Sequence, residues 1–372
     1  MKEKTEKIIV LSTVAATSLL AIFCLTKVAL SPNDLFSPLD FTKNLFTKNY
    51  ESETKEQPKL PATESKPITL IFGGDVMLSR HVNDRMVKNN DYSWPFINIA
   101  EYLSAADLTI VNLESPFAVA KDYSVPTGSF SFKANPEAMA GLLKSGIDLV
   151  SLANNHILNQ GTVGLEKTLE ILKANNIKSI GAGENETAAR QPEIFNIQNK
   201  KFGFLAYAYP DDNSVAAKNR PGVADMNLEK MATEVTALKK ETDFLTVIMH
   251  AGEEYTTKPN KQQISFAHQA IESGADLVIG HHPHWPQTIE IYQGKPIIYS
   301  LGNLVFDQMF SEETKTGLLA KINWENGLKD IELVPIKITD YGQANILEDG
   351  LEKETLFKKL NLPADGKIKI TE

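Results

Sequence analysis

A chain of 372 residues can bury a sizeable core, and its formal net charge of −9 argues against nucleic acid as a partner, since phosphate binding needs a basic surface. Its single cysteine, Cys24, excludes an internal disulfide framework and a zinc site built from several cysteines. A hydrophobic content of 42% and a charged content of 23% are ordinary for a globular protein.

The N-terminus is typical of a membrane anchor. An uncharged run over residues 8–26 follows three lysines, Lys2, Lys4 and Lys7. A membrane-spanning helix needs ~20 apolar residues, and the core of a cleavable signal peptide has only ~7–15. Flanking lysines stay on the cytoplasmic side. The pattern predicts a cytoplasmic segment over residues 1–7, a transmembrane signal anchor over 8–30 and an extracellular main domain at the cell membrane. A cleaved signal peptide is the alternative, and it also exports the domain.

Residues 31–66 are expected to form a linker. Prolines interrupt this segment, and its second half is rich in Lys, Glu, Ser and Thr with few apolar residues. Aromatic and leucine residues between positions 36 and 46 depart from that composition. They fit either a short helix at the membrane surface or packing against the main domain.

From Pro67 onward, apolar strand-like runs alternate with amphipathic helical segments. The clearest strands cover residues 68–72, 108–111, 147–152, 244–249 and 275–279, and the helices cover 137–144, 162–174, 228–240 and 261–273. Strands separated by helices predict crossover connections and a largely buried sheet. Further strand candidates have few helices between them, which favours antiparallel parts or two sheets packed face to face. They cover residues 202–207, 288–291, 297–300, 318–322 and 331–336. We expect one domain over residues 67–340 and a C-terminal extension over 341–372.

Polar and ligand-type side chains follow five of these strands, always at the same end. They are Asp75, Asn112 with Glu114, Asn155 with His156, His250, and His282 with His284. Singly, each has a plainer explanation as a helix N-cap, a turn or a solvated loop, but their recurrence favours a shared site beyond the carboxyl ends of the strands. A mixed set of carboxylates, amide and imidazoles suits one or two ions of Mn, Fe or Zn better than Ca or Mg.

These ordered motifs resemble those of calcineurin-like metallophosphoesterases. Longer segments, over residues 74–77, 153–156, 250–255, 274–284 and 299–308, resemble the CapA family, which is associated with bacterial poly-γ-glutamate capsule synthesis. The resemblance implies an α/β fold: a four-layer α/β/β/α sandwich of metallophosphoesterase type, with two mixed sheets inside and the transmembrane helix in front.

The resemblance also implies roles for individual residues. One ion would be held by Asp75, Glu114 and His284, and a second by Glu114, Asn155, His250 and His282, with Glu114 as the bridging carboxylate. His156 would be the catalytic residue that protonates the leaving group. We prefer His282 to His281 as a ligand, because a His-x-His pair on an extended segment points both rings the same way. His281 would then face the opposite side.

The candidate substrate-binding residues are Arg80, Glu254 and Asn303. Arg80 follows the first motif and fits a clamp for a phosphate or carboxylate oxygen, although a solvated arginine at a helix start is an equal alternative. Asn303 also fits a supporting role behind the histidine loop through hydrogen bonds.

The chain departs from the family patterns at five positions. Met77 stands where phosphoesterases carry a histidine ligand, Glu114 replaces an aspartate, and Ile157 replaces an acidic residue after the catalytic histidine. Asn159 and Ala251 stand where CapA-like sequences often have aspartate and tryptophan. A thioether is a poor ligand for a hard divalent ion, so Met77 removes one ligand from the first site. Ile157 removes the acidic partner of His156.

The resemblance, together with these features, favours a membrane-anchored, extracellular CapA-like component of poly-γ-glutamate synthesis or export. It leaves the chemistry open, with a metal-dependent hydrolase as one possibility. Its expected partners are the membrane, other subunits of a capsule polymer synthase and export complex, and the anionic polymer. Two alternatives stay open: a generic exported metallophosphatase, and a non-catalytic subunit that binds the polymer.

Overall fold

The chain divides after Ala62 into two units, Met1–Ala62 and Thr63–Glu372. The computed structural model describes residues 66–119, 130–209 and 214–370, all within the second unit. The predicted anchor over residues 8–30 and nearly all of the predicted linker therefore lie outside the described residues. Within the described part of the chain, no helix is both long and apolar enough to cross a membrane.

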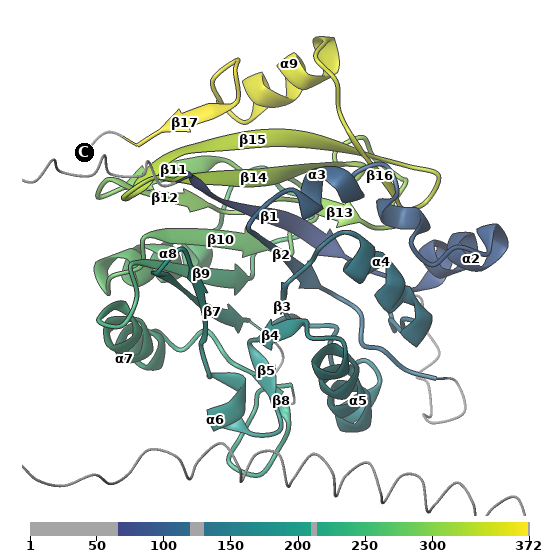
Figure 1. Cartoon of the computed structure of the whole chain (residues 1–372), viewed down its shortest axis with the longest axis horizontal. Helices are drawn as coiled ribbons and strands as arrows, with labels where there is room; N and C mark the ends of the chain where they lie inside the picture. The colour runs from purple at the N-terminus through teal and green to yellow at the C-terminus, as the bar shows by residue number, and fades with distance from the viewer. Residues whose placement is uncertain (1–65, 120–129, 210–213, 371–372) are drawn as a thin grey trace, which may run out of the picture. The chain divides into compact units, whose positions relative to one another are not determined.

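The first sheet has nine strands and is built around β1 (Figure 1). On one side of β1 (Ile68–Val76) lie the parallel strands β2 (Leu108–Leu113), β3 (Leu149–Ser151) and β4 (Lys178–Ile180). On the other side, each strand runs antiparallel to its neighbour, in the order β14 (Thr316–Trp324), β15 (Leu328–Thr339) and β16 (Gln343–Ile346). Two short strands complete the sheet: β13 (Asn303–Val305) on β1 and β17 (Lys367–Lys369) on β15. β16 and β17 lie beyond residue 340, so this part of the C-terminal extension adds strands to the sheet.

The second sheet has six strands, with four parallel strands between two antiparallel edges. Their order is β11 (Ile289–Tyr292), β12 (Lys295–Ile298), β10 (Leu277–His281), β9 (Phe244–His250), β7 (Lys200–Ala208) and β6 (Glu193–Ile197). A separate pair is formed by β5 (Ala182–Gly183) and β8 (Gly222–Val223). The predicted mixed α/β fold, with both parallel and antiparallel pairing, is confirmed.

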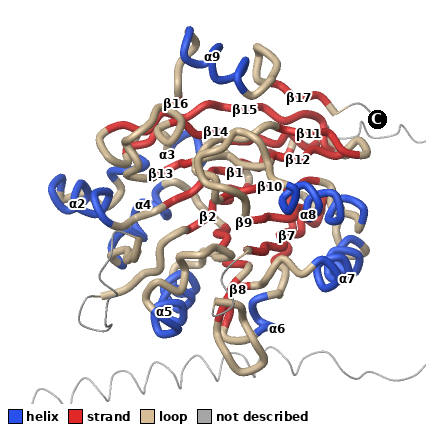
Figure 2. Tube along the Cα trace, turned by 180° about the vertical axis from the view of Figure 1, so that it is seen from behind, coloured by secondary structure: helices blue, strands red, loops and turns tan. Residues whose placement is uncertain are grey.

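Helices lie on the outer faces of the sheets. Residues of α3 (Ala100–Ser104) and α5 (Gly161–Ala174) contact the first sheet, and α7 (Leu228–Lys239) and α8 (Lys261–Glu272) contact the second. Seen from behind, α7 and α8 lie together on one side of the molecule (Figure 2). The other helices of the described residues are α2 (Arg80–Asn89), η1 (Trp94–Phe96), η2 (Pro136–Ala138), α4 (Met139–Lys144), α6 (Glu186–Ala189) and α9 (Leu351–Lys359).

The two sheets pack face to face through apolar side chains. Phe72 of β1 and Phe204 of β7 lie with their ring centroids 6.3 Å apart. Along β7 the side chains alternate between faces: Phe202 and Phe204 belong to the core shared with the first sheet, whereas Leu205 and Tyr207 pack with α7 and α8. Every residue of β9 is buried, as expected for a strand covered on both faces.

This packing brings the carboxyl ends of the central strands together. β9 and β10 are parallel and in register, so that His250 at the end of one lies beside His281 at the end of the other. In the first sheet, Asp75 of β1 is level with Asn112 of β2 and Asn303 of β13. The backbone approaches closely here, because the amide of Asp75 donates a hydrogen bond to the carbonyl of Gly302 at 3.0 Å.

We expect Gly74→Ala to lower the free energy of unfolding by about 3 kcal/mol, because a Cβ at this position would lie 2.0 Å from the Gly302 carbonyl oxygen. Gly294→Ala is the control: nothing lies within 4 Å of its added Cβ, and its φ is +73°, so only backbone strain of about 1 kcal/mol applies. Denaturant unfolding measures both variants. If both variants lost the same free energy of unfolding, the close approach of Gly74 to the Gly302 carbonyl would not limit the side chain at position 74.

Candidate metal centre

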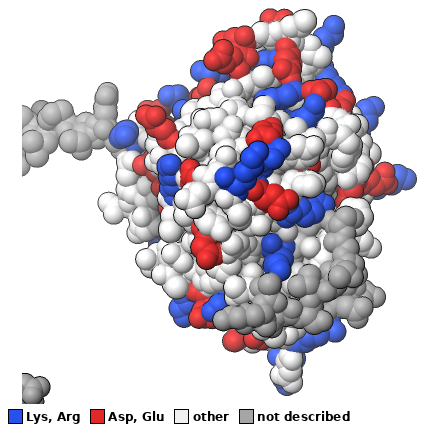
Figure 3. Space-filling view, turned by 90° about the vertical axis from the view of Figure 1, so that its right-hand side faces the viewer, with Lys and Arg blue, Asp and Glu red and all other residues white. Residues whose placement is uncertain are grey.

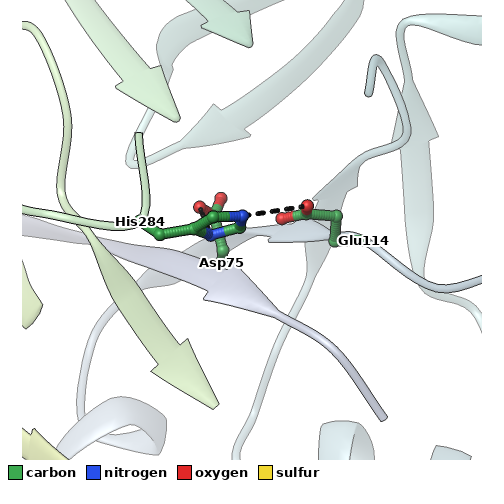
Figure 4. A group of neighbouring side chains, drawn as sticks. All are labelled: Asp75, Glu114 and His284. Atoms are coloured by element: carbon green, nitrogen blue, oxygen red, sulfur yellow. Dashed lines mark ion pairs between the residues drawn. The ribbon is translucent and has the colours of Figure 1, made fainter. Parts of the chain in front are cut away.

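Three buried side chains form a compact group at the carboxyl ends of the strands (Figure 4). Asp75 comes from β1, Glu114 follows β2 directly, and His284 comes from the loop after β10. One ligand atom of each residue lies within 4.8 Å of the ligand atoms of the other two. Asp75 and Glu114 have no exposed surface, and His284 is 2% exposed. Two carboxylates and an imidazole at this spacing are a donor set for a divalent metal ion.

The Asp75 carboxylate is surrounded by donors. Its Oδ1 accepts a hydrogen bond from the Asn112 amide at 2.8 Å and lies 3.3 Å from Nδ1 of His281. Its Oδ2 lies 3.3 Å from Nδ1 of His284 and accepts a weak hydrogen bond, of 3.4 Å, from the backbone amide of His282. Burial alone would raise the pKa of the Asp75 carboxyl, but the hydrogen bonds and charges of His281 and His284 hold that pKa well below its ordinary value.

Glu114 has the opposite electrostatic environment. Burial, followed by the charges of Asp75 and Glu254, raises the pKa of the Glu114 carboxyl well above its ordinary value, while Arg80 acts in the other direction. Among the described residues, its buried Oε1 has no hydrogen-bond partner. That atom lies 3.8 Å from Nε2 of His284. A buried acceptor without a donor costs free energy, and a cation between the two carboxylates would remove this cost. The residues present therefore fit a divalent ion.

A second group of ligand-type residues adjoins the first. The rings of His250 and His282 lie with their centroids 4.9 Å apart, and Nδ1 of His282 has no hydrogen-bond partner among the described residues. Nε2 of His250 lies 2.9 Å from Oδ1 of Asn155. Two of the predicted ligands of the second ion thus bond to each other, and this bond would have to open for both to bind an ion.

Asn112 connects the two groups, although we expected it only as a polar residue at a strand end. Its amide nitrogen lies 2.8 Å from Asp75, 3.4 Å from Glu114 and 3.3 Å from Nδ1 of His250. Its own oxygen accepts a hydrogen bond from the Asn154 amide at 3.1 Å. Asn112 therefore fixes the relative positions of a carboxylate and an imidazole from different sheets.

His156, the predicted catalytic residue, lies at the edge of the first group. Its Nε2 is 3.8 Å from Oε1 of Glu114, and its ring stacks on Phe132 with centroids 4.1 Å apart. Nδ1 lies 2.9 Å from Oδ1 of Asn159. This oxygen can only accept, so Nδ1 carries the proton and Nε2 presents its lone pair toward Glu114. Asn159 thus supplies the orienting contact that Ile157, a buried core residue, does not provide.

The expected geometry of the histidine loop is wrong. His282 has φ +97° and His284 has φ +58°, so this segment is not extended and its side chains do not alternate between faces. His281, expected to point away from the site, is 2% exposed and lies 3.3 Å from Oδ1 of Asp75. These two left-handed residues account for the difference, because they turn the chain after β10 back onto β1.

The candidate substrate-binding residues have different surroundings. Arg80 forms an ion pair with Asp307, and its guanidinium lies 4.8 Å from the centroid of the Phe132 ring, with 25% of the side chain exposed. Glu254 is exposed. Asn303 is buried, and its amide contacts Nδ1 of His284 at 2.9 Å and donates hydrogen bonds within the protein. This places Asn303 behind His284 as a supporting residue.

Met77 does not present its sulfur to the metal group. The side chain is fully buried, and its sulfur accepts a hydrogen bond from the backbone amide of Ser79 at 3.1 Å. The position at which phosphoesterases carry a histidine is thus filled by an apolar core residue.

Two mixed sheets with a buried Asp–Glu–His group at their strand ends define a mixed α/β protein with a candidate divalent metal centre. The family model described as "Bacterial capsule synthesis protein PGA_cap" matches residues 69–308, and the chain belongs to this family. The predicted membership of the CapA family is thereby confirmed.

Relatives with CapA in their names match most of the chain. It is 27% identical over 323 residues to "Capsule biosynthesis protein CapA" of Bacillus anthracis, covering 85% of this chain and 78% of the relative. It is 28% identical over 319 residues to "PGA biosynthesis protein CapA" of Bacillus subtilis (strain 168), covering 85% and 84%. A crystal structure of a hypothetical protein from Thermus thermophilus aligns with a TM-score of 0.48 at 14% identity, covering 73% of this chain and 100% of that one.

We expect the metal-free protein to lose stability as the pH falls from about 6.5 to about 4. Burial lowers the pKa of His156 from 6.5 to about 4, and it also lowers the pKa values of His250 and His282. In this interval the three imidazoles bind protons in the unfolded chain but not in the folded chain, whereas the raised pKa of Glu114 acts in the opposite direction. Three groups outweigh one, so the free energy of unfolding falls with the pH. His156→Gln should flatten this dependence.

Denaturant unfolding in the presence of a chelator measures the pH dependence. His81→Gln is the matched control, because the side chain of His81 is 65% exposed, and we expect its slope to equal that of the unsubstituted protein. A His156→Gln variant with an unchanged slope would show that the buried imidazole does not set the acid sensitivity.

Proposed function

We propose that the protein is a CapA-like component of poly-γ-glutamate capsule synthesis whose metal centre hydrolyses the γ-glutamyl amide bonds of the polymer. Membership of the capsule synthesis family and relatives named as CapA proteins support the role in the capsule. One observation carries the chemistry: the buried Oε1 of Glu114, without a hydrogen-bond partner among the described residues, lies 3.8 Å from the imidazoles of both His156 and His284.

A metal ion would be held first by Asp75, Glu114 and His284. His250, His282 and Asn155 would hold a second ion, with Glu114 shared between the two. The mixed oxygen and nitrogen donors favour Mn, Fe or Zn. When bound, such an ion supplies Lewis-acid stabilisation of the negative charge that develops on the reacting carbonyl group.

The protein's own residues would supply proton transfer and orientation. His156 is neutral near pH 7, because burial lowers its pKa to about 4, and its free Nε2 can accept a proton from the attacking water. The same nitrogen then gives that proton to the leaving amine nitrogen. Such transfers contribute roughly 10²–10⁴-fold to a rate. Arg80, held by Asp307, would contact an α-carboxylate of the polymer.

The charge of the protein restricts where the polymer can bind. The net charge is −9, and on the face shown in Figure 3 basic and acidic side chains are interspersed. A polyanion gains little from such a surface, so we expect polymer binding to concentrate at the metal centre, where cations focus the field.

We expect His156→Ala to keep its metal and to lose capsule production, because His156 transfers protons beside the ion. Asn155→Ala should lose both bound metal and capsule. Metal analysis of the purified protein and polymer yield of cells that carry only the variant measure these effects. The control is His81→Ala, which removes an exposed imidazole. Normal capsule production by the His156→Ala strain would contradict hydrolysis and would support a subunit that only binds the polymer.

The second candidate function is a non-catalytic subunit that binds the polymer. Met77 favours this function. Its thioether is fully buried and accepts a hydrogen bond from the Ser79 amide, so it does not serve as a ligand of the first ion. Here the metal would bind carboxylates of the polymer or hold the strand ends together, and His156→Ala would leave capsule production unchanged.

We further propose that residues 8–30 anchor the protein in the cell membrane with its main domain outside, next to other subunits of a polymer synthase and export complex. The uncharged run after the N-terminal lysines supports this proposal. The full chain should appear in the membrane fraction and be degraded when protease is added to intact protoplasts, while a cytoplasmic marker survives. Protection of the domain from protease would contradict an outward orientation.

A further inference from the structure

A continuous row of rings runs past the metal centre toward the surface. Neighbouring ring centroids are 5.8 Å apart for Phe132 and Phe306, 4.7 Å for Phe306 and His284, 6.2 Å for His284 and Tyr255, and 5.2 Å for Tyr255 and Phe310. Phe132 and Phe306 are buried, whereas Phe310 is 64% exposed. Phe310, separated from His284 by the Tyr255 ring, therefore presents an exposed aromatic face at the end of the row.

Tyr255 is held firmly in this row. Its backbone has φ +63°, which is unusual for a residue other than glycine, and its amide donates a hydrogen bond to the carbonyl of Pro283 at 2.9 Å. Its hydroxyl accepts a hydrogen bond from the Gln308 amide at 3.2 Å. Gln308 in turn accepts one from Asn303, whose other amide atom contacts His284. The position of the Tyr255 ring is therefore tied to that of a proposed metal ligand.

The two ends of the row differ in charge. Arg80 lies over Phe132, its guanidinium 4.8 Å from the ring centroid. Glu254 precedes Tyr255 and is exposed. Burial raises the pKa of the Tyr255 phenol, and the charge of Glu254 and its hydrogen bond to the phenol act in the same direction. Arg80, paired with Asp307, thus lies at the Phe132 end of the row, and the Glu254 carboxylate lies beside Tyr255, on which both charges act.

We infer, on the basis of the proposed function, that Glu254, Tyr255 and Phe310 form a subsite for the ammonium group at the amino end of a γ-linked glutamate chain. Aromatic faces attract cations, and the Glu254 carboxylate pairs with the same charge. Every residue of the polymer, the amino-terminal one included, carries an α-carboxylate that Glu254 repels, but only the amino-terminal residue adds an ammonium group that pairs with Glu254. The terminal residue is the one part of the polymer that brings a positive charge, so the subsite selects chain ends.

The test compares two synthetic γ-linked glutamate oligomers of equal length, one with a free amino end and one that is N-acetylated. Each is titrated calorimetrically into the full-length protein in detergent at pH 7, where an α-ammonium group is mostly protonated. The titrations are done with a chelator and again with added Mn²⁺. We expect the free form to bind about tenfold more tightly than the acetylated form in both conditions.

Four variants assign this preference to the subsite. Glu254→Gln and Phe310→Leu should each reduce it to about threefold or less, because one removes the charge and the other the aromatic face. Phe310→Tyr keeps the ring and should keep the preference. Glu253→Gln removes a charge from the neighbouring exposed position and should behave as the unsubstituted protein does.

Equal binding of the two oligomers by the unsubstituted protein would overturn the subsite, as would an absence of binding or a full preference in Glu254→Gln. None of these results decides the proposed hydrolysis, which is judged on capsule production by the His156→Ala strain. The two proposals can therefore fail separately.

Discussion

The site depends on two carboxyl groups, those of Asp75 and Glu114, being buried close together, with the His284 imidazole 3.3 Å from one and 3.8 Å from the other. His281 and His284 hold the pKa of the Asp75 carboxyl well below its ordinary value, whereas burial and the charges of Asp75 and Glu254 raise that of Glu114. When the pKa values of two adjacent carboxyl groups are shifted in opposite directions, the pair is a candidate site for a cation. The close approach of β1 and the Gly302 backbone, and the turn of the histidine loop, both serve this placement.

Neutral amides orient the imidazoles around this pair. Asn155, Asn159 and Asn303 contact His250, His156 and His284, each at 2.9 Å. An amide oxygen fixes which ring nitrogen carries the proton without adding a charge to the interior. In a site that already has two carboxyl groups, a further acidic partner would increase the like-charge repulsion. The replacement of an acidic partner by Asn159 is therefore consistent with the electrostatics of this chain.

The sequence predicted the strands and the residues at their ends, because buried parallel strands appear as apolar runs and their polar ends stand out. It also predicted that the ligand-type residues converge, since parallel strands present their carboxyl ends at one edge. The orientation of His281 was missed because left-handed backbone at His282 and His284 has no signature in residue type. Asn112 was noted only as a polar strand end, because a connecting role depends on contacts between sheets. Contacts between residues distant in sequence, such as the ion pair of Arg80 with Asp307, could not be predicted from the sequence either.

The order of strands in the first sheet has a consequence for biosynthesis. β1 is made early, yet its neighbour β14 comes from residues 316–324, and β15 pairs with strands from the last thirty residues. Contacts between such distant segments form slowly. During synthesis, a nascent chain that ends before β14 leaves one edge of β1 open and the sheet incomplete. Such a chain needs protection from aggregation until its last strands emerge.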